Sequence, residues 1–278
     1  MIVADLHLHS VHSDGMLTPA ELLQRAACRG LRWVALTDHD TVEGCQEALR
    51  VGRLLDIVVI PALEVTCYEL GQELHVLGYG VDVEDPRLWE HSQRARERRL
   101  RRLERMVGRC RRLGLSVALE DVAECAAGQM LGRPHLAAAL VQRGYCTSLQ
   151  EAFTRYLEPG KQVYEPPEEF PVVRALGLIH ATGGLAVLAH PRRTFQSPRS
   201  LLNLLRRGFD GIEVVHPSQG AGLQSYYGVL ARCHRLLATG GSDFHGTRPY
   251  DEMNFGKVGL TAEQINVLAE RLLNRRVA

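Results

Sequence analysis

The chain has 278 residues, 45% of them hydrophobic, and a formal net charge of +1 at pH 7. This length suits one α/β barrel or one domain with an insertion, and the near-neutral charge gives no general argument for binding to nucleic acid or a membrane. The seven cysteines form no C-x-x-C pair, which favours free thiols in a reducing compartment. No apolar run reaches membrane-spanning length and the first polar motif begins too early for a signal peptide, so we expect a cytoplasmic protein.

The N-terminal segment predicts a buried strand that leads into a group of polar residues. Residues 1–4 are apolar, and Asp5-Leu6-His7-Leu8-His9 follows them directly. Because strand side chains alternate between faces, His7 and His9 point to the same side. Together with Asp14 in the following loop they can bind one divalent ion. A polar loop with chance histidines is the alternative interpretation of this motif taken alone.

Strands and helices alternate along the rest of the chain, except in one long stretch. The alternation predicts a parallel sheet with crossover helices, as in an α/β barrel. Seven strands are expected, near residues 1–4, 33–36, 57–61, 73–79, 185–189, 211–215 and 236–239. Only helices and loops are indicated between residues 86 and 164. We therefore predict a barrel domain formed by residues 1–85 and 165–278, with a small helical insertion at 86–164.

Residue types that bind metals recur where the predicted strands end. Nine candidates follow this pattern, namely His7, His9, Asp14, His39, Glu64, His75, His190, Asp243 and His245. Since the strand ends of a parallel barrel meet on one face, we expect these side chains to form one catalytic site for two or three ions. Taken singly, His75 could be a core histidine, Glu64 a loop cap and Asp243 a turn residue. Structural roles do not explain why all of them lie at strand ends.

The order of these motifs resembles that of the PHP (polymerase and histidinol phosphatase) family. H-x-H with S-D-G, T-D-H-D, the lone Glu, the strand-four His, A-H-P and S-D-F-H succeed one another over nearly the whole chain. The resemblance implies a distorted seven-stranded (β/α) barrel that holds three metal ions. It implies one ion among His7, His9, Glu64 and Asp243, a second among Glu64, His75 and His190, and a third among Asp14, His39 and His245. Glu64 would bridge the first two ions, and Asp5 and Asp38 would either orient ligand imidazoles or be solvated loop acids.

The predicted insertion is similar to that of the nucleotide-directed PHP phosphoesterases. It carries Gly132-Arg133-Pro134-His135 and Tyr156-Leu157-Glu158-Pro159-Gly160-Lys161. The resemblance implies that the insertion covers the mouth of the barrel and that Arg133, His135 and Lys161 bind the substrate. His216, after the sixth strand, departs from the relatives in this group. It is either a substrate contact or a loop histidine.

The function that the resemblance implies is metal-dependent phosphoester hydrolysis. The expected substrates are nucleoside 3′,5′-bisphosphates, cleaved to the nucleoside 5′-monophosphate and phosphate, or short 5′-phosphorylated oligoribonucleotides, trimmed from 5′ to 3′. Histidinol-phosphate phosphatase is the alternative among enzymes, although Arg133 and His135 indicate a second anion site that it does not need. A nucleic-acid-binding module with a vestigial metal site is the alternative from another class.

The cofactors and partners follow from the same residues. Imidazole and carboxylate ligands suit Mn²⁺, Zn²⁺ and Fe²⁺, and of these we expect Mn²⁺. The expected partner is a nucleotide or a short oligonucleotide. No membrane association and no obligate protein partner are indicated.

An arginine-rich segment follows the start of the insertion. Ten arginines lie from Arg94 to Arg112, with Glu97 and Glu104 as the acids among them. Apolar residues at three- and four-residue spacing indicate a helix with one packed face. A solvated helix face is the first interpretation of the arginines, and an electrostatic footprint for RNA or nucleotide phosphates is the second.

Overall fold

The computed structural model describes residues 1–69, 71–126, 130–191 and 197–275. The chain divides into two compact units, each with its own core. The barrel unit comprises Met1–His91 and Phe170–Ala278, and the helical unit comprises Ser92–Glu169. In the described part of the chain, none of the helices is both long and apolar enough to cross a membrane.

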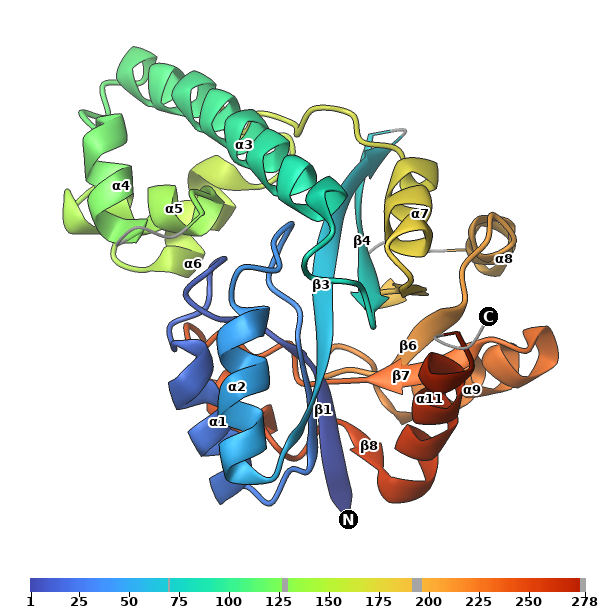
Figure 1. The fold of residues 1–278 in the computed structure, drawn as a ribbon. Helices are drawn as coiled ribbons and strands as arrows, with labels where there is room; N and C mark the ends of the chain where they lie inside the picture. Colours follow the sequence, from blue (N-terminus) through green and yellow to red (C-terminus); the bar gives the residue numbers. More distant parts are fainter. Residues whose placement is uncertain (70, 127–129, 192–196, 276–278) are drawn as a thin grey trace. The chain divides into compact units, whose positions relative to one another are not determined.

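The barrel unit is built on one sheet of eight strands (Figure 1). The strands are β1 (Ile2–Leu8), β2 (Trp33–Leu36), β3 (Val58–Glu69), β4 (Gln72–Tyr79), β5 (Leu185–Leu188), β6 (Gly211–Val215), β7 (Leu237–Gly240) and β8 (Leu260–Thr261). Their order in the sheet is β7-β6-β5-β4-β3-β2-β1-β8. The predicted α/β barrel is confirmed, but the count of seven strands is wrong. The additional strand, β8, has only two residues, which is too short to show an alternating pattern in the sequence.

The expectation of a wholly parallel sheet is also wrong. β4 runs antiparallel to both β3 and β5, and β8 runs antiparallel to β1. β3 continues past Pro61 as far as Glu69, and only two residues separate its end from β4. A connection this short makes a hairpin, because a parallel crossover needs a dozen residues or more.

The segment after β7 closes the gap between the two sides of the sheet. The Gly241 N–H donates to the carbonyl of Val215 (3.0 Å), which continues the β6 pairing. Farther along, Phe244 forms an isolated parallel bridge with Leu8, and its carbonyl accepts from His9 N–H (3.0 Å). The sheet is thus nearly closed, and the residues that follow β7 lie beside the end of β1.

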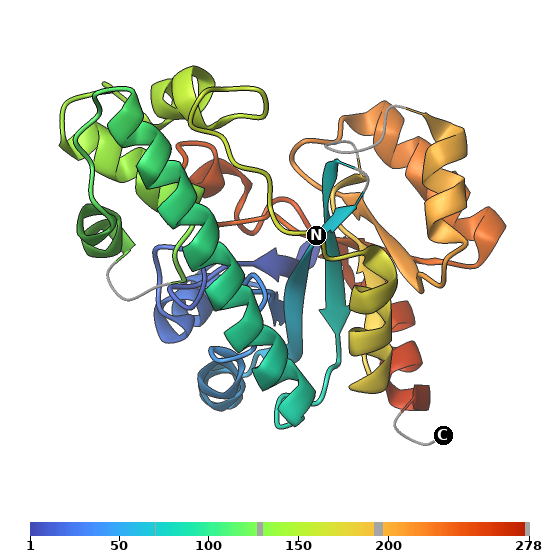
Figure 2. The same cartoon turned by 90° about the horizontal axis from the view of Figure 1, so that it is seen from above.

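Helices surround the sheet of the barrel unit (Figure 2). They are α1 (Pro19–Cys28), α2 (Cys45–Leu55), α7 (Val172–Ala181), α8 (Pro198–Leu205), α9 (Ala221–His234), α10 (Asp251–Asn254) and α11 (Ala262–Arg275). The apolar face of α1, including Leu22 and Leu23, packs with Val34, Leu36 and Val59 of the sheet in one buried cluster. This packing fixes the strands whose ends carry the polar residues.

The helical unit contains most of α3 (Pro86–Arg112), followed by α4 (Leu119–Ala126), α5 (Arg133–Gln142), α6 (Leu149–Ala152) and the π-helical turn η1 (Phe153–Leu157). Leu103, Met106 and Cys110 of α3 pack with Leu136 and Leu140 of α5 in its core. The unit therefore has a hydrophobic centre of its own, as an inserted domain requires.

Several α3 arginines have structural partners within the helical unit. Arg101 donates through Nε and Nη2 to the two carboxylate oxygens of Glu168 (3.1 Å each), and Arg105 donates to Glu165 (2.9 Å). Arg109 also pairs with Glu165. These arginines fasten the segment after η1 to α3. These three arginines therefore have a structural role, which neither the solvated-face interpretation nor the phosphate-binding interpretation of the segment included.

Two glycine substitutions test the β1–β8 pairing that completes the sheet. A Cβ at Gly259 would lie 2.0 Å from the Ala4 carbonyl oxygen, whereas a Cβ at Gly177 in α7 meets nothing within 4 Å. We expect Gly259→Ala to lower the free energy of unfolding by about 1–3 kcal/mol through overpacking. Gly177→Ala should raise it by about 0.5–1 kcal/mol, since alanine is the better helix former. Urea denaturation of both variants measures this, and equal effects would contradict the placement of β8.

Candidate metal centre

The nine predicted ligands gather at one edge of the barrel sheet. His9 and Asp14 follow β1, His39 follows β2, His190 follows β5, and Asp243 and His245 follow β7, while His7, Glu64 and His75 lie within β1, β3 and β4. The prediction that Glu64 lies beyond the end of its strand is wrong, because β3 extends to Glu69. His75 joins the edge because β4 is antiparallel, and its carbonyl accepts from the Ala189 N–H (3.1 Å) at the end of β5.

Glu64 lies at the middle of this group and is almost completely buried. Its Oε2 is 3.3 Å from Nε2 of both His7 and His9 and 3.2 Å from Nδ1 of His39. Its Oε1 is 2.9 Å from His75 Nδ1 and 3.0 Å from His190 Nε2. The two oxygens of one carboxylate therefore face two different sets of imidazoles, as a carboxylate that bridges two cations must.

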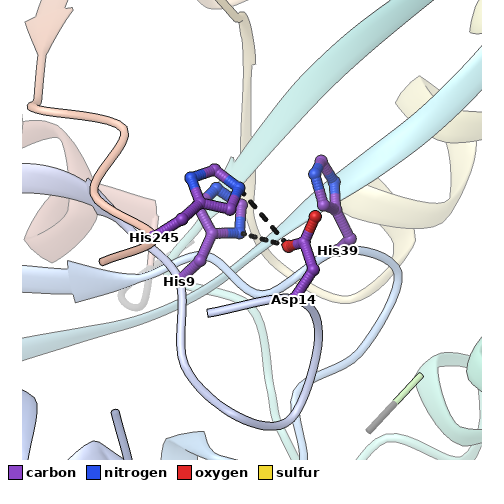
Figure 3. Close-up of side chains that lie close together, drawn as sticks. All are labelled: His9, Asp14, His39 and His245. Carbon is purple, nitrogen blue, oxygen red and sulfur yellow. Dashed lines mark ion pairs between the residues drawn. The ribbon is translucent and has the colours of Figure 1, made fainter. Parts of the chain in front are cut away.

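Two further carboxylates, those of Asp243 and Asp14, also lie close to imidazoles of this group. Asp243 Oδ1 lies 3.4 Å from Nε2 of both His7 and His9, so these two imidazoles face Glu64 and Asp243 together. Asp14 Oδ1 lies 3.3 Å from His245 Nε2 and 3.9 Å from His9 Nδ1, and Figure 3 shows this carboxylate with the rings of His9, His39 and His245 around it.

The buried polar atoms of this group are not satisfied by one another. His7 Nε2, both ring nitrogens of His9, His39 Nδ1, Glu64 Oε2 and Asp14 Oδ1 are buried and make no hydrogen bond within the described part of the chain. An unsatisfied buried polar atom is costly, so atoms of this kind call for a ligand. Imidazole nitrogens and carboxylate oxygens that converge in this way fit divalent metal ions.

Among the residues that the structure describes, three overlapping groups of side chains could each hold an ion, with ligand atoms within 4.8 Å of one another. They are His7, His9, Glu64 and Asp243; His9, Asp14, His39 and His245; and His39, Glu64 and His75. The first is the set that the family resemblance implies for one ion, and the second is the expected third set with His9 added. The remaining group contains His39 where His190 was expected, although His190 Nε2 still lies 3.0 Å from Glu64.

Burial and charge act on the protonation of these groups in opposite directions. Burial favours the neutral Glu64 carboxyl, but the imidazoles, His75 foremost, hold its pKa well below the usual range. Burial lowers the pKa of His39 to about 3. Burial also opposes a charged His75, yet Glu64 raises the pKa of that imidazole to about 10. Without a cation, the carboxylates thus stabilise the protonated form of some neighbouring imidazoles. A bound metal ion would replace these protons as the positive charge beside the carboxylates.

Asp5 and Asp38 contribute to the site by holding the loops that carry candidate ligands. Asp38 accepts hydrogen bonds from Ser10 N–H and from the hydroxyls of Ser10 and Ser13 (2.7 Å each), which fixes the loop between His9 and Asp14. Asp5 accepts from Ser242 N–H (2.8 Å), next to Asp243. Both acids are buried, so neither is a solvated loop acid, and the bonds they make hold ligand-bearing loops rather than ligand imidazoles.

Glu213 in β6 is a residue that the sequence interpretation missed. It is completely buried, its Oε1 accepts from His7 Nδ1 (2.9 Å), and its Oε2 accepts from His190 N–H (2.7 Å). A carboxylate on Nδ1 fixes the tautomer of His7 and leaves Nε2 free to face Glu64. The available signal was an acid between two apolar residues, Ile212 and Val214, in a predicted strand.

The four predicted substrate contacts fall in both units. His216 belongs to the barrel unit and lies against the candidate metal centre, 3.3 Å from Asp243 Oδ2. Arg133, His135 and Lys161 belong to the helical unit. The guanidinium of Arg133 lies over the Tyr164 ring at 5.9 Å, and His135 Nδ1 accepts from the Gly132 N–H (3.1 Å) at the start of α5. Lys161 is exposed.

One solved structure shows the same fold over nearly its whole length. It is a crystal structure of a candidate metal-dependent phosphoesterase from Bifidobacterium adolescentis. The TM-score is 0.85 at 29% sequence identity, and the match covers 98% of this chain and 96% of the other. The resemblance therefore includes both units.

Curated proteins and a family model give the same assignment. The 5′-3′ exoribonuclease Rnm of Escherichia coli (strain K12) is 34% identical over 91% of this chain and 88% of its own length. The 3′,5′-nucleoside bisphosphate phosphatase of Chromobacterium violaceum is 34% identical over 87% and 86%. The phosphoribosyl 1,2-cyclic phosphate 1,2-diphosphodiesterase of Eggerthella lenta is 35% identical over 88% and 95%. The PHP domain model matches residues 5–218. The chain belongs to the PHP domain family.

Proposed function

We propose that this protein is a metal-dependent phosphoesterase that removes the 3′-phosphate from nucleoside 3′,5′-bisphosphates and trims short 5′-phosphorylated oligoribonucleotides from the 5′ end. The observation that carries the proposal is the placement of Glu64, whose two oxygens face separate sets of imidazoles. When bound, divalent ions supply an activated water and neutralise charge on the phosphoryl oxygens. His7, His9, Asp14, His39, Glu64, His75, His190, Asp243 and His245 would hold these ions.

The protein's own part in the reaction is to hold the ligands at fixed positions. Glu213 sets the tautomer of His7, and Asp38 fixes the loop that carries Asp14. These two supports come from different parts of the sheet, Glu213 from β6 and Asp38 from the loop after β2. They hold the ligand atoms in fixed positions while charge develops during the reaction. Preorganisation of this kind is a major source of rate enhancement in enzymes.

The two relatives that act on nucleotides or RNA support the substrate class. One is named as a 3′,5′-nucleoside bisphosphate phosphatase and the other as a 5′-3′ exoribonuclease. A nucleoside 3′,5′-bisphosphate has a second phosphate besides the one attacked, and RNA has a phosphate at every linkage. We propose that Arg133, His135 and Lys161 of the helical unit bind that second phosphate. An arginine can do so through charge-assisted, bidentate hydrogen bonds.

The metal and the cellular location are further parts of this proposal. The candidate ligands are imidazoles and carboxylates, without a thiolate, which suits Mn²⁺ and also Zn²⁺ or Fe²⁺; we propose Mn²⁺. All seven cysteines are free thiols, which supports a reducing compartment and hence the cytoplasm.

Phosphate or nucleotide release from several substrates tests the function. Protein stripped of metal with a chelator should be inactive and should recover with Mn²⁺. It should then cleave a nucleoside 3′,5′-bisphosphate or a short 5′-phosphorylated oligoribonucleotide much faster than histidinol phosphate or a phosphoribosyl 1,2-cyclic phosphate. Elemental analysis that finds no transition metal in active protein would contradict the metal-dependent mechanism. Preference for histidinol phosphate would contradict the substrate class.

Glu213→Gln tests whether the buried carboxylate positions His7. A glutamine has one acceptor oxygen, so it cannot accept from both His7 Nδ1 and the His190 N–H, which now bond to different oxygens. We expect metal affinity to fall about 10–100-fold, as for other partners that orient metal-binding histidines. Calorimetric titration of metal-free protein measures this, with Glu270→Gln on the exposed face of α11 as the control. Unchanged metal affinity would show that Glu213 does not position His7.

Arg133→Ala tests the second phosphate contact. Loss of a desolvated charged contact commonly costs about 2–5 kcal/mol, so kcat/KM on a bisphosphate should fall by about 30-fold or more. Hydrolysis of a simple aryl phosphate should change little, because that substrate has no second phosphate. Arg112→Ala, at the exposed end of α3, controls for the loss of one positive charge. A parallel loss on both substrates would show that Arg133 does not bind the second phosphate.

A further inference from the structure

His216 is a further buried histidine at the candidate metal centre, and it lies against one of the two oxygens of the Asp243 carboxylate. It follows β6 and is 1% exposed. Its Nε2 lies 3.3 Å from Oδ2 of Asp243, while Oδ1 of the same carboxylate lies 3.4 Å from Nε2 of His7 and of His9. One oxygen of Asp243 thus faces the candidate metal ligands, and the other faces His216, whose buried Nε2 makes no hydrogen bond of normal geometry within the described residues.

The hydrogen bond at the far side of the His216 ring decides what Nε2 can do. Two groups of Ser218 contact His216 Nδ1, namely the hydroxyl oxygen at 2.8 Å and the backbone N–H, which donates to it at 3.0 Å. A hydroxyl can donate or accept, but a backbone amide is always a donor. Nδ1 therefore accepts, so the ring hydrogen is on Nε2. An Nε2 that carries hydrogen has no lone pair for a metal ion. It can donate a hydrogen bond instead.

Two histidines among the candidate ligands show the opposite arrangement. His7 Nδ1 lies 2.9 Å from the carboxylate of Glu213, and His245 Nδ1 lies 2.9 Å from the backbone carbonyl of Asp243. A carboxylate and a carbonyl only accept, so in both rings Nδ1 carries the hydrogen. Nε2 of each ring then has a free lone pair, and it faces Glu64 or Asp14. The groups on the far side of the ring thus distinguish these two histidines from His216.

We propose that His216 is a positioning residue for Asp243, one that donates from Nε2 to Oδ2 and so keeps Oδ1 directed at the metal ion. The inference deepens the proposed function and rests on it, since it concerns a ligand of the proposed site. The backbone of Asp243 is already held, with φ at +54° and its carbonyl bound by His245. Rotation of the carboxylate is the freedom that remains. Arg248 Nη1 also approaches Oδ2, but at 3.9 Å, so His216 makes the closer contact.

Asparagine and glutamine at position 216 separate the two ends of the ring. The asparagine amide can take the place of Nδ1 and accept from Ser218 N–H, but it is too short to reach Asp243. The glutamine amide can reach the place of Nε2 and donate to Oδ2. His216→Asn should therefore lose about 10–100-fold in affinity for one Mn²⁺ ion, as expected when a ligand loses the partner that orients it. His216→Gln should bind Mn²⁺ nearly as tightly as the natural protein.

The experiment is a calorimetric titration of the metal-free proteins with Mn²⁺, with metal counted per chain by elemental analysis. Thermal unfolding of the metal-free variants shows that each is folded, and His234→Gln on the exposed face of α9 is the control. Equal loss of Mn²⁺ in the Asn and Gln variants would overturn the proposal and make His216 a ligand. Unchanged Mn²⁺ affinity in both, with a raised KM for the nucleotide, would overturn it and make His216 a substrate contact. If the natural protein itself bound no divalent ion, the proposed function would fail as well.

Discussion

The structure depends on one buried carboxylate, that of Glu64, and on the five imidazoles around it. A carboxylate without water or cations nearby would be very costly in this position, and the imidazoles alone leave several buried atoms unsatisfied. Divalent cations resolve this conflict, because they satisfy nitrogen and oxygen atoms together. The binding energy of such ions is then part of the folding energy of the barrel, since no such site exists in the unfolded chain.

The arrangement of strands explains how residues far apart in sequence reach this carboxylate. β2 and β3 are parallel, and a bridge between His39 and Glu64 continues their pairing beyond the end of β2. β4 is antiparallel, so His75, near its start, comes to the edge where β5 ends. The segment after β7 pairs with the end of β1 and brings Asp243 beside His7. A single reversed strand therefore adds a ligand that a wholly parallel sheet would have left at the opposite edge.

Much of this could be predicted from local sequence, and the remainder depends on contacts that local sequence does not encode. His7 and His9 share a face because strand side chains alternate, and this property needs only two residues. The β3–β4 hairpin was missed because β3 runs on past Pro61 with mixed apolar and polar residues, so that its end looked like a loop. Glu213 was missed because its partners, His7 and His190, are distant in sequence and meet it only in the closed sheet. The ion pairs of the α3 arginines with Glu165 and Glu168 also depend on tertiary contacts between residues distant in sequence.

A histidine in a metal centre cannot be assigned a role by proximity alone, and the groups behind the ring carry the missing information. His7 and His216 both have Nε2 within 3.4 Å of Asp243, one at each carboxylate oxygen. Their Nδ1 atoms differ, since one donates to a carboxylate and the other accepts from a backbone amide. This difference makes one ring a lone-pair donor and the other a hydrogen-bond donor. The loop after β6 thereby controls the chemistry of the site through a backbone N–H, a group that side-chain motifs do not describe.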